Sequence, residues 1–171
     1  MKRNKHLYYI IITGLLAALT IVLIQFAGIP AGPGRIHFGD AIILLAAALL
    51  PTPYAIAVGA LGGGLHNVLF GLVMWAPITV VVKATMTIPF SAKQNKLLTK
   101  RNLFALLPYW IITVVGYAVY EILFISLADA WTAVFFISAV RNTIQVAGSA
   151  VLFVAFAAVL DKIKFKQRIE L

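Results

Sequence analysis

Three charged side chains lie within stretches that are otherwise apolar enough to enter a lipid bilayer. Lys83 stands in the middle of MWAPITVVVKATMTIPF, residues 74–90, and Glu121 and Arg141 interrupt two later apolar stretches. A charge that faces lipid costs at least about 2.5–3.5 kcal/mol, so such residues turn toward a ligand, water or each other. A structural ion pair is one interpretation. Because two cations share one carboxylate, we favour a ligand pocket.

Composition places this pocket in a membrane protein. Of the 171 residues, 63% are hydrophobic and 11% are charged, which is too few polar residues to cover a soluble domain. The absence of cysteine excludes disulfides, thiolate metal ligands and a cysteine nucleophile. The net charge of +9 is concentrated between the apolar stretches, which indicates membrane topology and no nucleic-acid partner.

The apolar stretches predict an all-α integral membrane protein with six transmembrane helices in one domain, residues 1–171. The predicted helices cover approximately residues 7–27, 40–50, 54–71, 74–90, 103–127 and 131–160. The first is too long for the apolar core of a signal peptide, so we expect it to be retained. The Gly/Pro-rich segment GIPAGPGRIHFG cannot continue it and is predicted to be an extracellular loop before the short second helix.

Basic residues fall mostly on one side of this arrangement. With six spans, both termini share a side with the linker at residues 91–102, and this side carries eleven of the 14 Lys and Arg residues. The positive-inside rule makes it the cytoplasmic side, so both termini are predicted to be cytoplasmic. At about 1.5 Å per helical residue, Lys83, Glu121 and Arg141 then lie between the bilayer midplane and the outer surface.

Helical spacing places more polar and aromatic side chains beside these charges. Asn142 and Gln145 share the face of Arg141, Tyr117 and Tyr120 lie beside Glu121, and Trp75 and Thr79 precede Lys83 in steps of four. Two further pairs stand at the outer ends of the second and third predicted helices. We expect a pocket open to the outside, built from Lys83, Arg141, Glu121, Asn142, Gln145, Trp75, Tyr117, Tyr120, His37, Asp40, His66 and Asn67. For His66, a helix–helix hydrogen bond is an equal alternative to ligand binding. For Trp75 and Trp131, anchoring at the membrane interface is an equal alternative to stacking on a ligand.

Small residues recur at helical spacing on two predicted helices. Gly59 and Gly63 lie on the third, where close packing inside the chain is the favoured interpretation. Gly14, Ala17 and Ala18 lie on the first helix, where a docking surface for another membrane protein is an equal alternative.

The segment RIHFGDAIILLAAALLPTPYAIAVGALGGGLHNVLFG, followed by WAPITVVVKA, resembles the substrate-binding S components of energy-coupling factor (ECF) transporters. Its H-x-GD loop, LLP-x-PYA turn and WAP…K helix are similar to those of a vitamin-uptake branch, and the similarity covers nearly the whole chain. The branch points to hydroxymethylpyrimidine or pyridoxine as substrate.

This resemblance implies a multi-pass protein of a prokaryotic plasma membrane that is not an enzyme and carries no cofactor or metal. It would bind a vitamin-type molecule from outside beneath the first outer loop. Its partners would be a membrane T protein and two cytoplasmic ATPase subunits, which use ATP. Lys83 and Arg141 would bind an anionic or carbonyl group. Glu121, Asn142 and Gln145 would form hydrogen bonds to a heterocycle, and Trp75, Tyr117 and Tyr120 would stack on it. His37 and Asp40 would lie at the lid. Gly14, Ala17 and Ala18 would dock onto the T protein.

Two other classes of protein remain open from the residues alone. A stand-alone secondary transporter or channel is the stronger rival, although no inverted repeat is visible. A membrane-embedded enzyme is the weaker one, since the sequence contains no H-E-x-x-H motif and no nucleophile with nearby partners. No Walker motif occurs either, so any coupling to ATP must come from a partner.

Overall fold

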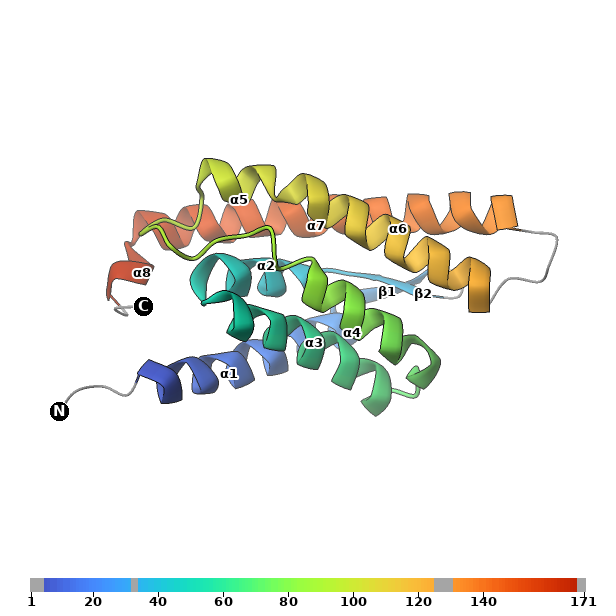
Figure 1. Ribbon diagram of the computed structural model, residues 1–171, viewed down its shortest axis with the longest axis horizontal. Coiled ribbons are helices and arrows are strands. Elements are labelled where there is room, and N and C mark those ends of the chain that lie inside the picture. Colours follow the sequence, from blue (N-terminus) through green and yellow to red (C-terminus); the bar gives the residue numbers. More distant parts are fainter. Residues whose placement is uncertain (1–4, 32–33, 125–130, 169–171) are drawn as a thin grey trace.

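Helices form most of the computed structural model, which describes residues 5–31, 34–124 and 131–168 (Figure 1). A short two-stranded hairpin and a 3-10 turn, η1, complete it. The elements in chain order are α1 (Lys5–Phe26), β1 (Gly28–Ala31), β2 (Gly34–His37), α2 (Asp40–Leu49), α3 (Thr52–Leu69), η1 (Val73–Trp75), α4 (Ala76–Thr85), α5 (Lys100–Phe104), α6 (Leu106–Phe124), α7 (Trp131–Lys162) and α8 (Phe165–Arg168).

Two of the predicted helices differ from the structure at a proline. The stretch predicted at 74–90 is helical in α4 only to Thr85, and residues 86–89 form tight turns with i→i−3 hydrogen bonds. Pro89 disfavours a helical conformation at the residue before it. The stretch predicted at 103–127 begins earlier, at Lys100. It is divided at Ala105, because Pro108 has no N–H to donate to the carbonyl of Phe104. Residues 125–127 lie outside the described part.

The predicted outer loop contains the hairpin, a short element that the sequence did not predict within an otherwise helical chain. β1 and β2 pair antiparallel, with Ile29 opposite Ile36 and Pro30 opposite Arg35. Glycine and proline exclude a helix here, but they permit a short edge strand. On the open side of an edge strand no hydrogen bond requires the N–H that proline lacks.

Three helical stretches of the described residues are long and apolar enough to cross a membrane: Lys5–Phe26, Lys100–Phe124 and Trp131–Lys162. Asp40–Leu49 and Val73–Thr85 are shorter apolar helices. The outward surface is apolar, as Leu15, Leu123 and Val151 show with two thirds or more of each side chain exposed. Lys83 and Glu121, in contrast, are buried. An apolar exterior around buried charges fits a protein whose solvent is lipid, whereas the six-span count stays a prediction.

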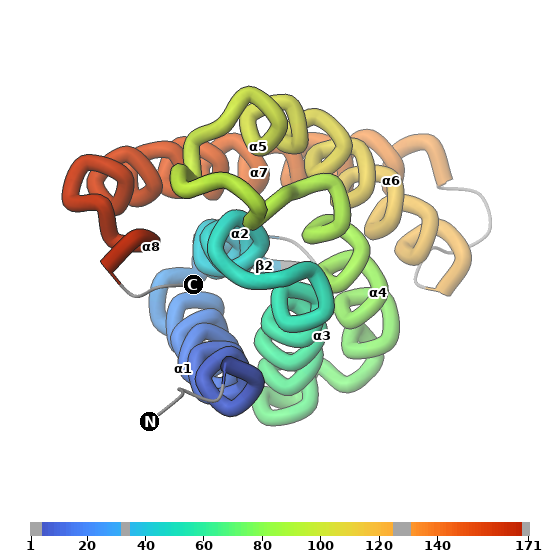
Figure 2. Tube along the Cα trace, turned by 60° about the vertical axis from the view of Figure 1, so that its left-hand side comes forward, coloured from blue at the N-terminus to red at the C-terminus, as the bar shows by residue number. Residues whose placement is uncertain are grey.

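The short helix α2 occupies the centre of the bundle (Figure 2). Every residue from Asp40 to Leu50 is buried, and α2 packs against α1, α3 and α7. Other helices surround α2, with α3 packed against both α1 and α4, and α6 packed against both α4 and α7. The first residue of α2, Asp40, is therefore carried into the interior.

Glycines allow α3 to approach its neighbours closely, as the spacing predicted. A Cβ built on Gly59 would lie 2.2 Å from the backbone oxygen of Lys83, and one on Gly62 would lie 2.8 Å from the side chain of Thr20. A larger residue at Gly59 would push α4 away, so this glycine sets the position of Lys83.

The two ends of the bundle differ. The beginning of α1, α8 and the segment before α5 lie at one end (Figure 1). η1, the end of α6 and the beginning of α7 lie at the other. Both described chain ends thus share one end of the bundle with the basic linker at residues 91–102.

Candidate functional site

A cavity of about 280 Å³ is lined by residues from α1, β2, α3, η1, α4, α6 and α7. Polar and aromatic groups dominate its wall. The lining residues are Ile24, Arg35, His37, Gly63, His66, Asn67, Leu72, Trp75, Thr79, Tyr117, Arg141, Asn142 and Gln145. Residues from most of the chain length therefore converge on one hollow inside an otherwise apolar bundle.

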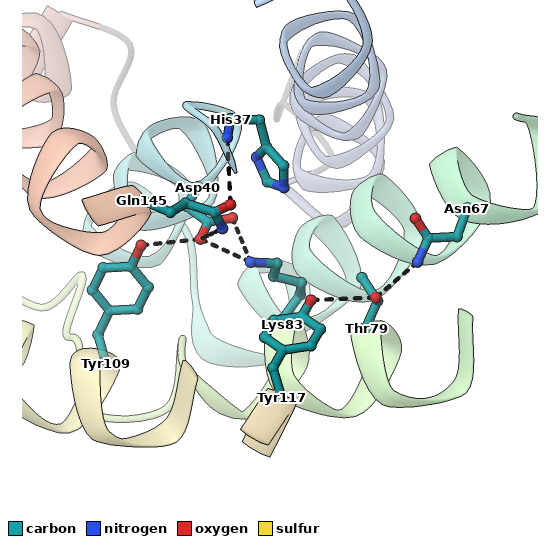
Figure 3. Close-up of polar contacts among 8 residues, drawn as sticks. All are labelled: His37, Asp40, Asn67, Thr79, Lys83, Tyr109, Tyr117 and Gln145. Carbon is teal, nitrogen blue, oxygen red and sulfur yellow. Dashed lines mark hydrogen bonds and ion pairs between the residues drawn. The ribbon is translucent and has the colours of Figure 1, made fainter. Parts of the chain in front are cut away.

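A buried ion pair lies behind this wall. Lys83 Nζ is 2.7 Å from Asp40 Oδ1, and neither side chain is exposed (Figure 3). The Tyr109 hydroxyl donates a hydrogen bond of 3.0 Å to Asp40 Oδ2. Lys83 is thus neutralised by a carboxylate from α2. Asp40, which was expected at the lid, lies in the interior instead, because α2 begins inside the bundle.

Arg141 forms the second ion pair of the site. Its Nη2 donates to Glu121 Oε1, and both side chains are buried. Its Nη1 is also buried but has no hydrogen-bond partner among the described residues. Arg141 lines the cavity and Glu121 does not. A buried guanidinium N–H without a partner is a donor for an acceptor atom of a ligand.

A chain of hydrogen bonds follows the wall from α6 to α1. Tyr117 and Asn67 both donate to Thr79 Oγ1, at 3.2 and 2.8 Å (Figure 3). His66 Nε2 lies 3.2 Å from Gln25 Oε1, a contact between α3 and α1. His66 therefore takes part in a helix–helix hydrogen bond and also lines the cavity.

Two aromatic rings border the cavity. Their centroids, those of Trp75 and Tyr117, are 6.4 Å apart. Tyr120 lies behind Trp75, with 5.8 Å between the ring centroids, and its hydroxyl donates to the backbone oxygen of Met74. Trp75 and Tyr117 can contact a planar ligand directly, whereas Tyr120 supports Trp75.

His37 brings the hairpin into the wall. Its backbone N–H donates to Gln145 Oε1 at 3.3 Å, and its Nδ1 is buried without a partner among the described residues. Burial lowers the pKa of the His37 imidazole from 6.5 to about 3. The Asp40 carboxylate opposes this shift, while the charges of Lys83, His66 and Arg35 add to it. The imidazole is therefore neutral at pH 7, with one nitrogen available as an acceptor.

The predicted binding residues fall into two groups. The first lines the cavity: Arg141, Asn142, Gln145, Trp75, Tyr117, His37, His66 and Asn67. The second group does not line it, but each member contacts a residue that does: Lys83, Asp40, Glu121 and Tyr120.

The predicted docking residues on α1 also divide. Ala17 is 4% exposed and faces α3, where its carbonyl oxygen lies near Gly62. Gly14 and Ala18 are exposed, and a Cβ on Gly14 would have no atom within 4 Å.

Sequence reasoning missed Arg35, Thr79 and three apolar or small residues of the wall. Nη2 of Arg35 donates to the backbone oxygen of Gln25, which fastens the hairpin to the end of α1, and to that of Gly28 in the first strand of the hairpin. A basic residue on the side where the positive-inside rule predicts few was the signal that could have identified it. Thr79 lies on the predicted polar face of Lys83 and was not included in the binding set.

Comparison with known protein families supports a role in uptake. Residues 4–162 match the family described as ECF-type riboflavin transporter, S component. No curated protein matches the chain. Members of this family are non-enzymatic membrane subunits that bind vitamin-type substrates and act with an ECF T protein and ATPases. The match covers nearly the entire length of the chain, and it accompanies apolar helices around a cavity with polar residues in its wall. The protein therefore belongs to this family of ECF S components.

Proposed function

We propose that the protein is the high-affinity binding subunit through which a prokaryotic cell imports a one-ring vitamin or vitamin precursor. Hydroxymethylpyrimidine and pyridoxine are the candidate substrates that we favour, because the motifs in RIHFGD and WAPITVVVK resemble those of the branch that takes up such molecules. Riboflavin, which the family description names, is the competing substrate. The observation that carries the proposal is the cavity lined by Arg141, Trp75 and Tyr117.

The size of the cavity supports a small ligand. Pockets for drug-sized ligands range from roughly 300 to 1,000 Å³, and this one, at about 280 Å³, lies at the lower limit. A single heteroaromatic ring with hydroxymethyl groups suits this volume better than a three-ring flavin with its ribityl chain. Trp75 and Tyr117 would contact the substrate ring, because aromatic side chains pack offset or edge-to-face against other aromatic rings.

The chemistry of the wall supports a ligand rich in hydrogen-bond acceptors. The free Nη1 of Arg141 would donate to a ring nitrogen or hydroxyl oxygen of the substrate. His37 Nδ1 would accept from a hydroxyl group or donate to an acceptor, depending on its tautomer. Asn67 and Asn142 add amide groups to the same wall.

Transport would require partners. Both described chain ends lie at the end of the bundle with the basic linker, which the positive-inside rule assigns to the cytoplasm. The exposed face of α1 around Gly14 and Ala18 would dock onto the T protein, because small residues permit close helix contacts. Two ATPase subunits would use ATP and drive release, and this chain would need no cofactor of its own.

Calorimetry on the purified protein in nanodiscs tests the substrate. We expect hydroxymethylpyrimidine or pyridoxine to bind at least about 100-fold more tightly than riboflavin, and Arg141→Gln to weaken that binding. Tightest binding of riboflavin would contradict the size argument. Uptake into liposomes containing this chain alone, without T protein and ATPases, would contradict the S-component role and favour a secondary transporter.

A further inference from the structure

The side chain of Gln145 connects the buried ion pair to the hairpin. Its Nε2 donates to Asp40 Oδ2 at 3.1 Å, and its Oε1 accepts the backbone N–H of His37 at 3.3 Å (Figure 3). Gln145 is 3% exposed, so both contacts are buried. The two ends of one amide group thus join α2 to β2.

The carboxylate of Asp40 determines which way this amide points. A carboxylate can only accept hydrogen bonds, and Asp40 Oδ2 accepts one from Lys83 at 2.8 Å and one from Tyr109 at 3.0 Å. The NH₂ group of Gln145 must therefore face Asp40. Its carbonyl oxygen is then the end that faces the hairpin, where the N–H of His37 needs an acceptor.

The hairpin is fastened at few other points among the described residues. Arg35 connects it to the end of α1 through the backbone oxygen of Gln25. Directly after β2, the ring of Phe38 stands against Gly148 of α7, where an added Cβ would lie 2.6 Å from Phe38 Cε1. The bond from His37 to Gln145 is thus a principal polar attachment of the hairpin to α7.

We propose that Asp40 and Lys83 are positioning residues, which orient the Gln145 amide and so hold the hairpin against α7 over the cavity. Neither residue lines the cavity, and the contact of Asp40 with Gln145 is the one that extends to the hairpin, through the backbone N–H of His37. When the orientation of Gln145 is lost, the hairpin opens more often and a bound ligand leaves faster. The part of the proposal that concerns a ligand rests on the proposed function, and the part that concerns the hairpin does not.

Hydrogen–deuterium exchange on the ligand-free protein in nanodiscs tests the hairpin. The double variant Asp40→Leu with Lys83→Met removes both charges together and leaves no buried ion without a partner. We expect amide exchange in β1 and β2 to rise about tenfold, with α6 and α7 unchanged. Tyr109→Phe is the matched control, because it removes one bond to Asp40 but leaves the ion pair and the Gln145 contact. It should leave hairpin exchange within about twofold.

Two results would overturn the proposal. One is unchanged exchange in the hairpin, and the other is an equal rise in every helix, which a merely structural ion pair would produce. Should the double variant fail to fold, Gln145→Met removes the same attachment with the ion pair intact, and unchanged hairpin exchange in it would be equally decisive.

A ligand measurement completes the test. With radiolabelled hydroxymethylpyrimidine as probe, the double variant should raise the dissociation rate about tenfold and leave the association rate within about twofold. An unchanged dissociation rate would refute control of release by the hairpin. If the unaltered protein binds no probe, the proposed substrate is wrong, while the exchange result still decides the role of Asp40 and Lys83.

Discussion

Lys83 pairs with Asp40, 43 positions earlier in the chain, and not with Glu121, for which the sequence left Lys83 and Arg141 as equal candidate partners. Glu121 pairs with Arg141 instead. Each cation thus has its own carboxylate, and the two pairs differ in their relation to the cavity. Arg141 lines it with an unpartnered Nη1, whereas Lys83 lies behind the wall. Arg141 is therefore the residue expected to contact a ligand.

Removing one member of the Lys83–Asp40 pair should be strongly destabilising. Lys83→Met leaves Asp40 charged and buried without compensation, and we expect the free energy of unfolding to fall by about 3–5 kcal/mol. Adding Asp40→Leu should restore most of this loss, because the apolar pair has no charge to desolvate. Thermal unfolding of the three proteins in one detergent measures the effect. A single variant as stable as the parent would mean that Asp40 is not ionised.

Arg141→Gln should weaken substrate binding by about 10- to 100-fold, the range for a lost hydrogen bond to a charged group. Glu121→Gln is the matched control, because it keeps the guanidinium in the wall and removes only its buried partner. We expect a smaller loss of affinity for the control in calorimetry. Equal losses would show that the ion pair, and not the free Nη1, matters for binding.

Substrate binding should quench the fluorescence of Trp75. Trp75 lines the cavity, whereas Trp110 and Trp131 are 40% and 58% exposed on the outer surface. We expect Trp75→Phe to abolish the quenching and weaken affinity modestly, since a phenyl ring preserves part of the aromatic contact. Quenching that persists in Trp75→Phe but disappears in Trp110→Phe would place the ligand elsewhere.

His37 should make the stability dependent on pH in the acid range. The pKa of its imidazole is about 3 in the folded protein and 6.5 ordinarily, so the unfolded chain binds a proton first as the pH falls. The free energy of unfolding is therefore highest above pH 6.5 and decreases toward pH 3, by up to about 1.4 kcal/mol per pH unit. The melting temperature measured at several pH values, compared with that of His37→Asn, isolates this contribution. Parallel curves for the two proteins would contradict it.

Two glycines should respond in opposite ways to alanine. Gly59→Ala places a Cβ against the backbone of Lys83 and should lower the melting temperature clearly. Gly14→Ala meets no atom within 4 Å and replaces a poor helix former, so stability should rise by about 0.5–1 kcal/mol.

Gly14→Leu extends the test to the partner: it should leave substrate affinity unchanged and reduce ATP-driven uptake with the T protein and ATPases. Unimpaired uptake would exclude this face as the docking surface.

The sequence by itself determined where most helices run and which side chains turn inward. The 3.6-residue period puts Arg141, Asn142 and Gln145 on one face, and the cost of charge in lipid turns that face toward the interior. The prolines at 89 and 108 were visible too, but their effect depends on which carbonyl loses its donor and on how the neighbouring turn adjusts.

Only the tertiary structure decided which polar groups meet. Spacing along a helix gives the direction of a side chain but not the partner that it faces, so the pairing of Lys83 with Asp40 required the central position of α2. The contribution of Arg35 and His37 depended on a hairpin folding back to α1 and α7, and such a contact between distant segments leaves no periodic pattern in the chain. Local patterns are set by neighbours in the sequence, whereas a site built from seven elements is set by packing in three dimensions.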